Sequence, residues 1–418
     1  MRIGIVGNGG REAALAWRLS RSPSVSELVA LSAGDGWPAG TRMAAASDVA
    51  GQVGAAVALG LDLVVVGPEG PLAEGLVDRL QGAGIVAFGP SAAAARLESS
   101  KAFAKEVMAA ASVPTAEAVL VDASDPQSVA RGRERCRRGG VVVKADGLAA
   151  GKGVVVAPDA RDALAALDAM LAGQFGDAAQ AIVLEDLLEG PEVSVFGLSD
   201  GERVVGLVSA QDHKRVGEGD VGPNTGGMGA IAPCPLVDAE GVAHLVRTVH
   251  APVVAEMARR GTPFRGVLYA GLMMTPAGPR VLEFNTRFGD PECQVLMATW
   301  ADDPVPWLLG AANGRLPSGQ PRFLGAACCV VLASPGYPEG STSGIPVPDP
   351  MVTDDVVTFV AGARRGPDGP LRTSGGRVTG VTGIASDLVE ARRRAMAALP
   401  SQTFPGAVFR RDIGLRWT

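Results

Sequence analysis

An alternating run of polar and apolar residues in the second half of the chain carries oxygen ligands at regular spacing. It reads RVLEFNTRFGDPE over residues 280–292 and has the pattern of a β-strand. Successive side chains of a strand point to opposite faces, so Leu282 and Phe284 should share one face. Glu283 and Asn285 should share the other, about 7 Å apart. A carboxylate and an amide oxygen suit Mg²⁺, which shares its remaining positions with water and nucleotide phosphates.

More charged residues follow this strand at once. Arg287, Asp290 and Glu292 surround a turn that contains Gly289 and Pro291. A half-buried strand with a solvated polar face is the alternative interpretation, but an ordinary hairpin end does not require so many converging charges. We therefore expect these side chains to lie near a reacting group.

The sequence GNGGRE (residues 7–12) follows a predicted strand and opens a predicted helix. Gly9, Gly10 and Arg11 can place bare backbone NH groups and the positive helix end against a phosphate or a carboxylate. A dinucleotide fingerprint would need Gly or Ala at its sixth position, where this chain has Glu12. The pattern favours an anion site over a nicotinamide site, and a tight turn without a ligand is the alternative.

The sequence KADGLAAGKG (residues 144–153) is rich in glycine but is not a Walker loop. No Ser or Thr follows Lys152, and predicted strands flank the segment on both sides, whereas a P-loop leads into a helix. A strand-turn-strand flap over residues 141–157 could fold over phosphates, with Lys144 and Lys152 supplying compensating charge. A flexible glycine hairpin with a solvated lysine is the alternative.

Two acidic residues flank a loop between predicted strands. In IVLEDLLEGPEVSV (residues 182–195), Glu185 ends one apolar strand and Glu192 begins the next. Such a loop can offer backbone donors and acceptors to an adenine edge, while a carboxylate takes the ribose hydroxyls. The pattern is consistent with a nucleotide site but does not establish one by itself.

The segments AQDHKR (residues 210–215) and GPNTGGMGA (residues 222–230) place a dense group of charges before a glycine-rich loop. A solvated turn is the simplest interpretation of each segment taken alone. The density of Asp, His, Lys, Arg and Asn instead favours a mobile loop that closes over a substrate.

The composition is that of an ordinary globular chain. Of 418 residues, 47% are hydrophobic, and 38 Lys and Arg nearly balance 44 Asp and Glu. The formal net charge of −6 argues against a nucleic-acid partner held by bulk electrostatics. No apolar run approaches about 20 residues, and Arg11 and Glu12 interrupt the first apolar stretch, so we expect neither membrane spanning nor export. The predicted location is the cytoplasm.

Cysteine and histidine usage excludes some classes of metal site. The five cysteines show no metal-type spacing, and adjacent Cys328 and Cys329 lie in an apolar run that predicts a buried strand. The chain has three histidines, so a histidine-rich zinc site is not expected.

Segment patterns predict an α/β multidomain protein, and the length alone suggests about three domains. Strands and helices alternate over residues 1–101, which predicts a doubly wound parallel sheet with ligands beyond the carboxyl ends of its strands. Residues 102–320 should form a second domain, with a lid over about 114–190 and a central part over 191–320. Residues 321–418 are rich in Gly, Val and Thr and predict a β-rich C-terminal domain.

Four of these segments together closely resemble one enzyme family: KADGLAAGKG, QDHKR, PNTGGMGA and EFNTRFGDPE. They resemble the phosphoribosylamine-glycine ligases (glycinamide ribonucleotide synthetases), ATP-grasp enzymes of purine synthesis, and the resemblance covers essentially the whole chain. It implies that glycine attacks the γ-phosphate of ATP to give an acyl phosphate, from which 5-phosphoribosylamine displaces phosphate. It also implies Mg²⁺ or Mn²⁺, a monomer, small-molecule substrates, and no nucleic-acid or membrane partner.

The resemblance implies roles for individual residues. The implied ATP-binding residues are Lys105, Lys144, Gly151, Lys152, Gly153, Glu185, Leu187 and Glu192, and the implied metal ligands are Glu283 and Asn285. The residues expected near the reacting groups are Asp212, Lys214, Arg287 and Asp290. The expected substrate-binding residues are Gly9, Gly10, Arg11, Asn224, Thr225, Gly226 and Gly227. Such a site agrees with phosphoryl transfer, which needs alignment and charge neutralisation more than covalent help.

Three segments depart from the usual family sequence. Ala13 replaces the histidine of GREHA, residues 32–41 replace a PGNAGT loop, and VAGAR around Ala361 replaces HAGT. Two departures lie in the N-terminal domain, so they bear on the acceptor amine and leave the ATP chemistry untouched; Ala13 is expected on a helix surface. Three alternatives remain: a ligase for a different amine, a nucleotide-binding regulatory protein without catalysis, and a dehydrogenase.

Overall fold

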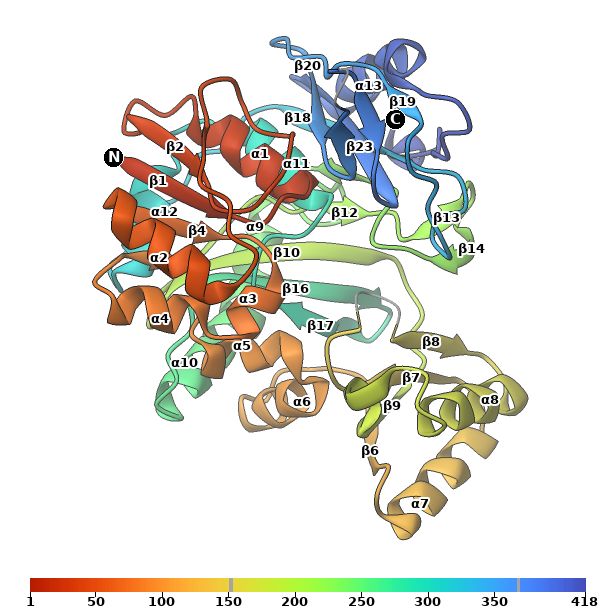
Figure 1. The fold of residues 1–418 in the computed structure, drawn as a ribbon. Coiled ribbons are helices and arrows are strands. Elements are labelled where there is room, and N and C mark those ends of the chain that lie inside the picture. Colours follow the sequence, from red (N-terminus) through yellow and green to blue (C-terminus); the bar gives the residue numbers. More distant parts are fainter. Residues whose placement is uncertain (150–152, 367–368) are drawn as a thin grey trace.

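The computed structural model describes residues 1–149, 153–366 and 369–418, and its elements form four regions (Figure 1). These regions are an N-terminal parallel sheet, a small lid, a central antiparallel sheet and a β-rich C-terminal region. The predicted α/β multidomain fold is therefore confirmed. Gly151 and Lys152, expected to bind ATP, lie outside the described residues.

The N-terminal region is a five-stranded parallel sheet in the order β3-β2-β1-β4-β5. Leu63 and Val65 pack into one hydrophobic core and Val64 and Val66 into another, because helices cover both faces of the sheet. This arrangement is the predicted doubly wound sheet. Its elements are β1 (Arg2–Val6), α1 (Gly10–Leu19), β2 (Glu27–Ala30), β3 (Arg42–Met43), α2 (Val49–Leu59), β4 (Leu63–Val66), α3 (Glu69–Ala73), α4 (Leu76–Gly82), β5 (Ala87–Phe88) and α5 (Ala92–Ser99).

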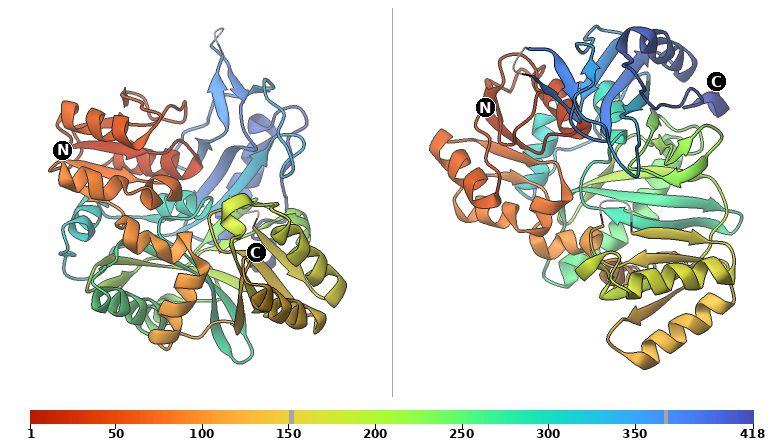
Figure 2. Two further views of the ribbon diagram at one scale, coloured as in Figure 1. Left: turned by 60° about the horizontal axis from the view of Figure 1, so that its bottom comes forward. Right: turned by 45° about the vertical axis from the view of Figure 1, so that its right-hand side comes forward.

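The lid is a four-stranded antiparallel sheet in the order β6-β9-β7-β8, with its own hydrophobic core. It projects away from the other regions below β17 (Figure 1), and Figure 2 shows it from two further sides. Strands β7 and β8 pair antiparallel, as expected for the flap. The elements are β6 (Ala118–Asp122), α7 (Pro126–Arg137), β7 (Val141–Ala145), β8 (Val154–Ala157), α8 (Ala160–Leu171), the short helix η1 (Gly176–Ala179) and β9 (Ala181–Asp186).

The central region carries the predicted metal strand on the edge of a sheet in the order β11-β10-β16-β17. A bulge interrupts the pairing of β16 with β17, because Gly271 pairs with Glu283 but Leu272 pairs with Val281. The elements are α6 (Lys101–Ala110), β10 (Glu192–Asp200), β11 (Val204–Gly206), α9 (Ala239–Leu245), the π-helix η2 (Val246–His250), α10 (Ala251–Arg259), β16 (Arg265–Thr275), β17 (Gly278–Asn285), α11 (Glu292–Thr299) and α12 (Val305–Ala312).

The bulge corrects one expectation from the sequence. Val281 and Phe284, not Leu282 and Phe284, enter the same hydrophobic core, because Leu282 is the extra residue of the bulge. Leu282 instead lies at the wall of the cavity. Beyond the bulge the alternation is regular, so Glu283 and Asn285 lie on one side of the strand as predicted.

The C-terminal sheet has the order β12-β15-β18-β23-β20 and includes two strands from the middle of the chain. The sheet therefore crosses the boundary placed at residue 320, and that boundary remains a prediction. Cys328 and Cys329 lie buried in β18, as expected. The elements are β12 (Gln211–Asp212), β13 (Arg215–Gly217), β14 (Val221–Asn224), β15 (Gly229–Ala232), β18 (Ala326–Ala333), β19 (Pro346–Val347), β20 (Val356–Val360), β21 (Ala363–Arg365), β22 (Leu371–Thr373), β23 (Arg377–Ala385), α13 (Leu388–Gln402) and η3 (Leu415–Trp417).

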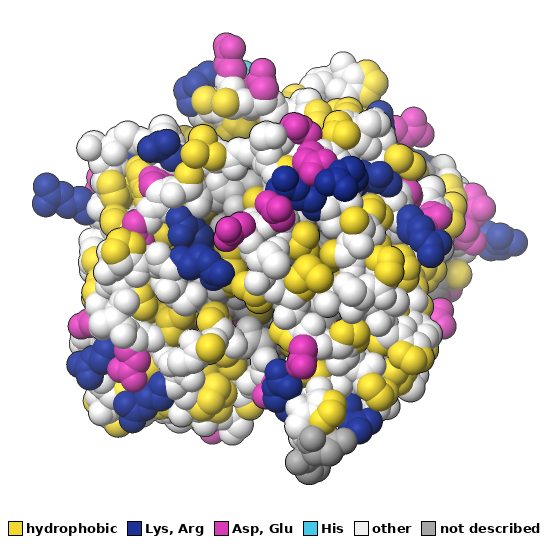
Figure 3. All heavy atoms as spheres, turned by 90° about the horizontal axis from the view of Figure 1, so that it is seen from above, with side chains coloured by type: hydrophobic (Ala, Val, Ile, Leu, Met, Phe, Trp, Pro, Cys, Tyr) yellow, Lys and Arg dark blue, Asp and Glu magenta, His cyan; other side chains and the backbone are white. Residues whose placement is uncertain are grey.

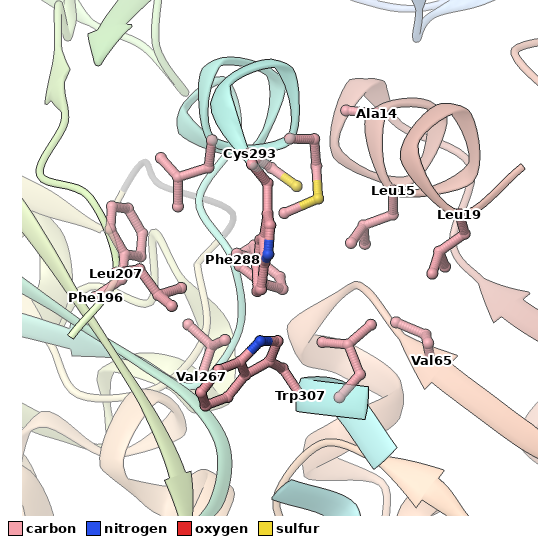
Figure 4. Close-up of a cluster of buried hydrophobic side chains, with 14 of the residues drawn as sticks. Ala14, Leu15, Leu19, Val65, Phe196, Leu207, Val267, Phe288, Cys293 and Trp307 are labelled. Carbon is pink, nitrogen blue, oxygen red and sulfur yellow. The ribbon is translucent and has the colours of Figure 1, made fainter. Parts of the chain in front are cut away.

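A shared hydrophobic core joins the N-terminal, central and C-terminal regions. Figure 4 shows Leu15 of α1, Cys293 of α11 and Trp307 of α12 around Phe288, which directly precedes the turn into α11. Ala13 belongs to the same core and is 4% exposed, so its expected position on the helix surface was wrong. Helix α1 is buried here because it packs against α11 and β20.

The surface and the helix lengths bear on possible partners. On the face shown in Figure 3, Lys and Arg side chains are interspersed with Asp and Glu, so this face presents no patch of one sign. Among the described residues, the helices are all too short or too polar to span a membrane.

Candidate active site

One cavity of about 1220 Å³ lies where the four regions meet. Most of the expected site residues that are described contribute to its wall: Arg11, Lys105, Lys144, Gly153, Glu185, Leu187, Glu192, Asp212, Lys214, Asn224, Thr225, Gly226, Glu283, Asn285, Arg287 and Asp290. Gly9, Gly10 and Gly227 are not among the lining residues. Residues far apart in the sequence thus reach one site.

Two lysines share one buried carboxylate on the lid side of the cavity. Glu185 Oε1 lies 3.1 Å from Lys105 Nζ, and Glu185 Oε2 lies 2.7 Å from Lys144 Nζ. Lys105 also donates to Thr115 Oγ1 and Ala116 O, and burial lowers the pKa of its ammonium group. Two ammonium groups thus share a single carboxylate, which leaves an excess of positive charge. A polyphosphate can supply the missing negative charge.

The segment that joins the lid to the central sheet contains the expected adenine site. The NH of Leu187 donates to Gly140 O at 3.0 Å, so it is already engaged. The next residue, Leu188, also lines the cavity, and within the described chain its NH has no hydrogen-bond partner. Leu188 was not expected from the sequence, because a backbone donor carries no residue-type signal.

Lys214 lies between the predicted nucleotide side of the cavity and the predicted metal strand. Its Nζ lies 2.9 Å from Glu192 Oε2 and 3.8 Å from Glu283 Oε1. Burial opposes the charged form, but Glu192 and Glu283 outweigh it and raise the pKa of Lys214 well above its ordinary value. Lys214 is therefore a fixed cation between two carboxylates.

The predicted metal ligands fit a divalent ion that is shared with a nucleotide. Burial alone would raise the pKa of Glu283, but Lys214 and Lys144 lower it below its ordinary value, so the carboxylate stays ionised. The described residues contain no group of three or more His, Cys, Asp or Glu that could hold a metal by themselves. Two hard oxygen donors on one strand edge suit Mg²⁺ when phosphates and water complete its shell.

Asp212 and the buried Glu292 form a further group of carboxylates near Lys214. Burial and the nearby Glu292 raise the pKa of Asp212 well above its ordinary value. Asp212 Oδ1 is buried without a hydrogen-bond partner among the described residues, whereas Glu292 Oε1 accepts from Ser194 Oγ at 3.1 Å. An unsatisfied buried carboxylate is costly unless a donor or cation approaches it. The pair is therefore suited to bind a small ammonium group.

Arg287 is held by two acidic residues that the sequence reasoning missed. Its Nη2 lies 2.8 Å from Glu98 Oε1, and its Nε donates to Glu69 Oε2 at 3.2 Å. Glu98 Oε2 also accepts from the NH of Thr286 at 2.7 Å. Glu98 and Glu69 occur more than 180 residues before Arg287, at the ends of N-terminal elements, so no local pattern linked them.

Arg377 of the C-terminal sheet fixes the glycine-rich loop against Asp290. Its Nη2 lies 3.2 Å from Asp290 Oδ2, and its Nη1 donates to the carbonyl oxygens of Gly226 and Asp290. Burial would raise the pKa of Asp290, but Arg377 and Arg11 lower it below the ordinary value. The NH of Gly226 donates to Tyr337 Oη at 3.0 Å, so the loop expected to be mobile is bonded to the C-terminal region in this structure.

Gly227 lies behind the cavity wall. A Cβ atom there would lie 2.6 Å from Asp212 Oδ1 and 2.4 Å from Pro291 Cδ, and its φ is +112°. Only glycine tolerates both the close approach and this backbone conformation. Its contribution is to let the loop pass close to Asp212.

The expected anion nest at the start of α1 is partly occupied by the protein itself. The NH of Gly9 donates to Glu12 Oε2 at 2.7 Å, so Glu12 caps its own helix. Glu12 Oε1 also lies 2.6 Å from Arg11 Nε. The Gly9 amide is therefore not free for a substrate, and Arg11 remains as the residue of this segment that reaches the cavity.

Comparison with known proteins identifies the family. Residues 1–98, 99–293 and 327–416 match the N domain, the ATP-grasp (A) domain and the C domain of phosphoribosylglycinamide synthetase. The phosphoribosylamine--glycine ligase of Caulobacter vibrioides is 46% identical, with 100% of this chain and 98% of that protein covered. That of Agrobacterium fabrum is 43% identical, with 99% and 98% covered.

Solved structures agree. The crystal structure of the phosphoribosylamine--glycine ligase from Thermotoga maritima has a TM-score of 0.83 and 28% identity, covering 99% of this chain and 100% of that chain. The biotin carboxylase domain of Hydrogenobacter thermophilus 2-oxoglutarate carboxylase, in complex with MgADP, has a TM-score of 0.73 at 18% identity, covering 98% and 91%, and shows the fold alone. This chain belongs to the phosphoribosylglycinamide synthetase family.

Proposed function

We propose that the chain joins glycine to 5-phosphoribosylamine with ATP, through glycyl phosphate, to give glycinamide ribonucleotide, ADP and phosphate. The observation that supports this most directly is the position of Lys214. Lys214 contacts Glu192 on the proposed ATP side of the cavity and Glu283 on the proposed metal strand. It also follows Asp212 by only two positions in the sequence. Glycine bound at Asp212 would therefore lie beside the phosphate that it must attack.

The nucleotide is proposed to bind between the lid and the central sheet. Lys105 and Lys144 would contact its phosphates and neutralise part of their charge. The carboxylate of Glu185 could then accept hydrogen bonds from other donors. The backbone NH of Leu188 would donate to the adenine edge, because the NH of Leu187 already donates to Gly140 O. Glu283 and Asn285 would hold Mg²⁺ or Mn²⁺, which neutralises charge on the phosphates.

The proposed first step forms a bond between a glycine carboxylate oxygen and the γ-phosphorus, and the bond from that phosphorus to the bridging oxygen of ADP breaks. Lys214 and Lys144 supply fixed positive charge where the phosphoryl oxygens gather. Asp212 and Glu292 hold the glycine ammonium group away from the reacting carboxylate. The protein contributes alignment and electrostatics rather than a covalent intermediate of its own.

The proposed second step transfers the glycyl group. The amine nitrogen of phosphoribosylamine attacks the acyl carbon, the bond from carbon to the phosphate oxygen breaks, and the nitrogen loses a proton. Arg11 and Arg287 line the part of the cavity next to the carboxyl ends of β1 and β4, where an α/β sheet binds its ligand. They are the proposed contacts for the phosphate of the acceptor, together with the predicted loop Asn224, Thr225 and Gly226.

An assay of ADP release with a panel of amines tests this function. We expect release that requires glycine and phosphoribosylamine together and falls sharply with an unphosphorylated amine. Equal rates with unphosphorylated amines would favour the ligase of different acceptor specificity, for which the departures at Ala13 and residues 32–41 are the specific observation. The monomeric state and the cytoplasmic location also remain predictions, testable by light scattering and fractionation.

A further inference from the structure

The last residues of the chain run along the segment that carries Asp212 and Lys214. This terminal segment, residues 409–417, contains the FRRDIG sequence, to which no role has been given so far. Three of its hydrogen bonds to residues 211–220 run from Trp417 Nε1 to Gln211 Oε1 at 2.7 Å, from the NH of Gly414 to His213 Nε2 at 3.4 Å, and from the NH of Arg411 to Glu218 Oε1 at 2.9 Å.

Arg410 is the central residue of this contact. It is 1% exposed, although it carries a charge and a long side chain. Asp412 accepts a two-pronged hydrogen bond from it, from Nε to Oδ1 at 2.8 Å and from Nη2 to Oδ2 at 2.7 Å. This parallel geometry gives orientation as well as attraction.

The same guanidinium fixes both ends of hairpin β13–β14. Arg410 Nη1 donates to Arg215 O at 3.0 Å and to Asp220 Oδ1 at 2.7 Å. Asp412 Oδ2 accepts from the NH of Gly219 at 2.7 Å, in the turn of the hairpin. Asp220 has a φ of +57°, a conformation that few residues other than glycine adopt. The terminal segment therefore holds this turn through three separate polar contacts.

The hairpin is part of the wall of the active site. It begins directly after Lys214 and ends at Asn224, and Arg215, Asp220 and Asn224 all line the cavity. A small shift of the hairpin would move Lys214 relative to Glu192 and Glu283, and misplacement of about 1 Å can cost roughly a hundredfold in rate. The lid residues that contact ATP in the proposed function lie on other elements.

We propose that Arg410 and Asp412 form a positioning pair for the ligase reaction, which holds hairpin β13–β14 so that Asp212 and Lys214 face glycine and the transferred phosphate. This inference rests on the proposed function. Arg410 and Asp412 also line the cavity, but four of the five guanidinium N–H groups of Arg410 already donate to the protein, so we assign the pair a positioning role. If Arg410 only filled space in the core, an apolar side chain could do the same without the cost of burying a charge.

Steady-state kinetics of Arg410→Lys and Asp412→Asn test the proposal, with Arg411→Ala as the matched control. Lysine keeps the charge of Arg410 but loses the planar fork, and Asp412→Asn keeps the shape but loses the charge. We expect kcat to fall about tenfold or more in both variants while the KM for ATP changes less than about threefold. Amide hydrogen exchange should become faster in residues 215–224 and stay unchanged in β1. The control should behave as wild type, because Arg411 contacts the hairpin through its backbone NH.

Two results would overturn the proposal. One is an unchanged kcat in a variant whose hairpin exchanges faster, which would show that the position of the hairpin does not limit catalysis. The other is a KM for ATP that rises as much as kcat falls, which would indicate general loosening. If Arg410→Lys does not fold, Asp412→Asn decides alone. If wild type itself makes no glycinamide ribonucleotide, the proposed function fails instead, so the two failures are distinguishable.

Discussion

Glu185 Oε2 lies 2.7 Å from Lys144 Nζ, across the adjacent strands β9 and β7. The sequence placed both residues in the nucleotide site but gave them separate partners, adenosine and phosphate. The structure pairs them directly and adds Lys105 to the same carboxylate. In the protein without nucleotide, Glu185 therefore supplies the negative charge that the phosphates of ATP would supply later.

The variant Glu185→Gln removes the shared anion of two lysines. We expect the free energy of unfolding to fall by about 1–3 kcal/mol, because an amide compensates the buried ammonium groups poorly. Scanning calorimetry should show a smaller loss in the presence of an ATP analogue with Mg²⁺, since phosphates then face the lysines. The control is Glu134→Gln on the exposed surface of α7, which should change Tm little. A loss that nucleotide does not reduce would contradict this account.

The variant Glu283→Gln tests the metal site. It keeps the shape of the side chain but removes the charge that a divalent ion requires, so turnover should fall roughly a hundredfold or more while Tm is retained. Titration of Mg²⁺ in the ATPase assay should show a weaker apparent affinity. The matching substitution Glu202→Gln, at an exposed turn, should leave both quantities unchanged. Near-normal Mg²⁺-dependent turnover in Glu283→Gln would rule out this ligand.

Asp212 should make glycine binding depend on pH. Because burial and Glu292 raise the pKa of Asp212, the carboxyl group contributes stability below its unfolded pKa, and this contribution is lost as pH rises through the folded value. Binding an ammonium group requires the ionised form, so the affinity for glycine should increase as pH rises through that folded pKa. Calorimetry with an ATP analogue should show proton release on binding. Asp212→Asn should abolish the release, and a release that survives this substitution would assign it to another group.

The variant Ala13→His should destabilise the protein. Ala13 is a buried residue of α1 that faces the loop at Gly36; a Cβ atom added at Gly36 would lie 3.3 Å from the Cβ of Ala13, so a larger side chain at position 13 has little space. We expect the free energy of unfolding to fall by about 1–3 kcal/mol, as for other overpacked cores. Ala109→His, at an exposed position of α6, is the control and should have little effect. A variant as stable as wild type, with tighter binding of phosphoribosylamine, would instead support a donor role for the histidine.

Local patterns in the sequence were sufficient for the elements and for much of the site. The alternation of residues 2–88 predicted the parallel sheet, and the pattern around Glu283 predicted two oxygen donors that share one side of a strand, because both signals depend on periodicity within a short window. The bulge at Leu282 was not predictable, since it depends on how β16 pairs with β17.

Contacts over long sequence distances account for what was missed. Glu98 lies 188 residues from its partner Thr286, Arg377 lies 151 residues from Gly226, and Arg410 lies 195 residues from Arg215. None of these three charged residues belongs to a motif that reveals its partner. The capping of α1 by Glu12 is different, because Gly9 and Glu12 have the spacing of a capping box. This contact is local, so the spacing of Gly9 and Glu12 in the sequence is sufficient to indicate it.

The most direct test of the central claim follows one oxygen atom. Glycine labelled with ¹⁸O in its carboxylate is incubated with the protein, ATP, Mg²⁺ and phosphoribosylamine, and the released phosphate is analysed by mass spectrometry. If the reaction passes through glycyl phosphate, each phosphate carries one ¹⁸O from glycine, because the bond broken in the second step is that between the acyl carbon and this oxygen. Phosphate without label, released during formation of glycinamide ribonucleotide, would contradict the account.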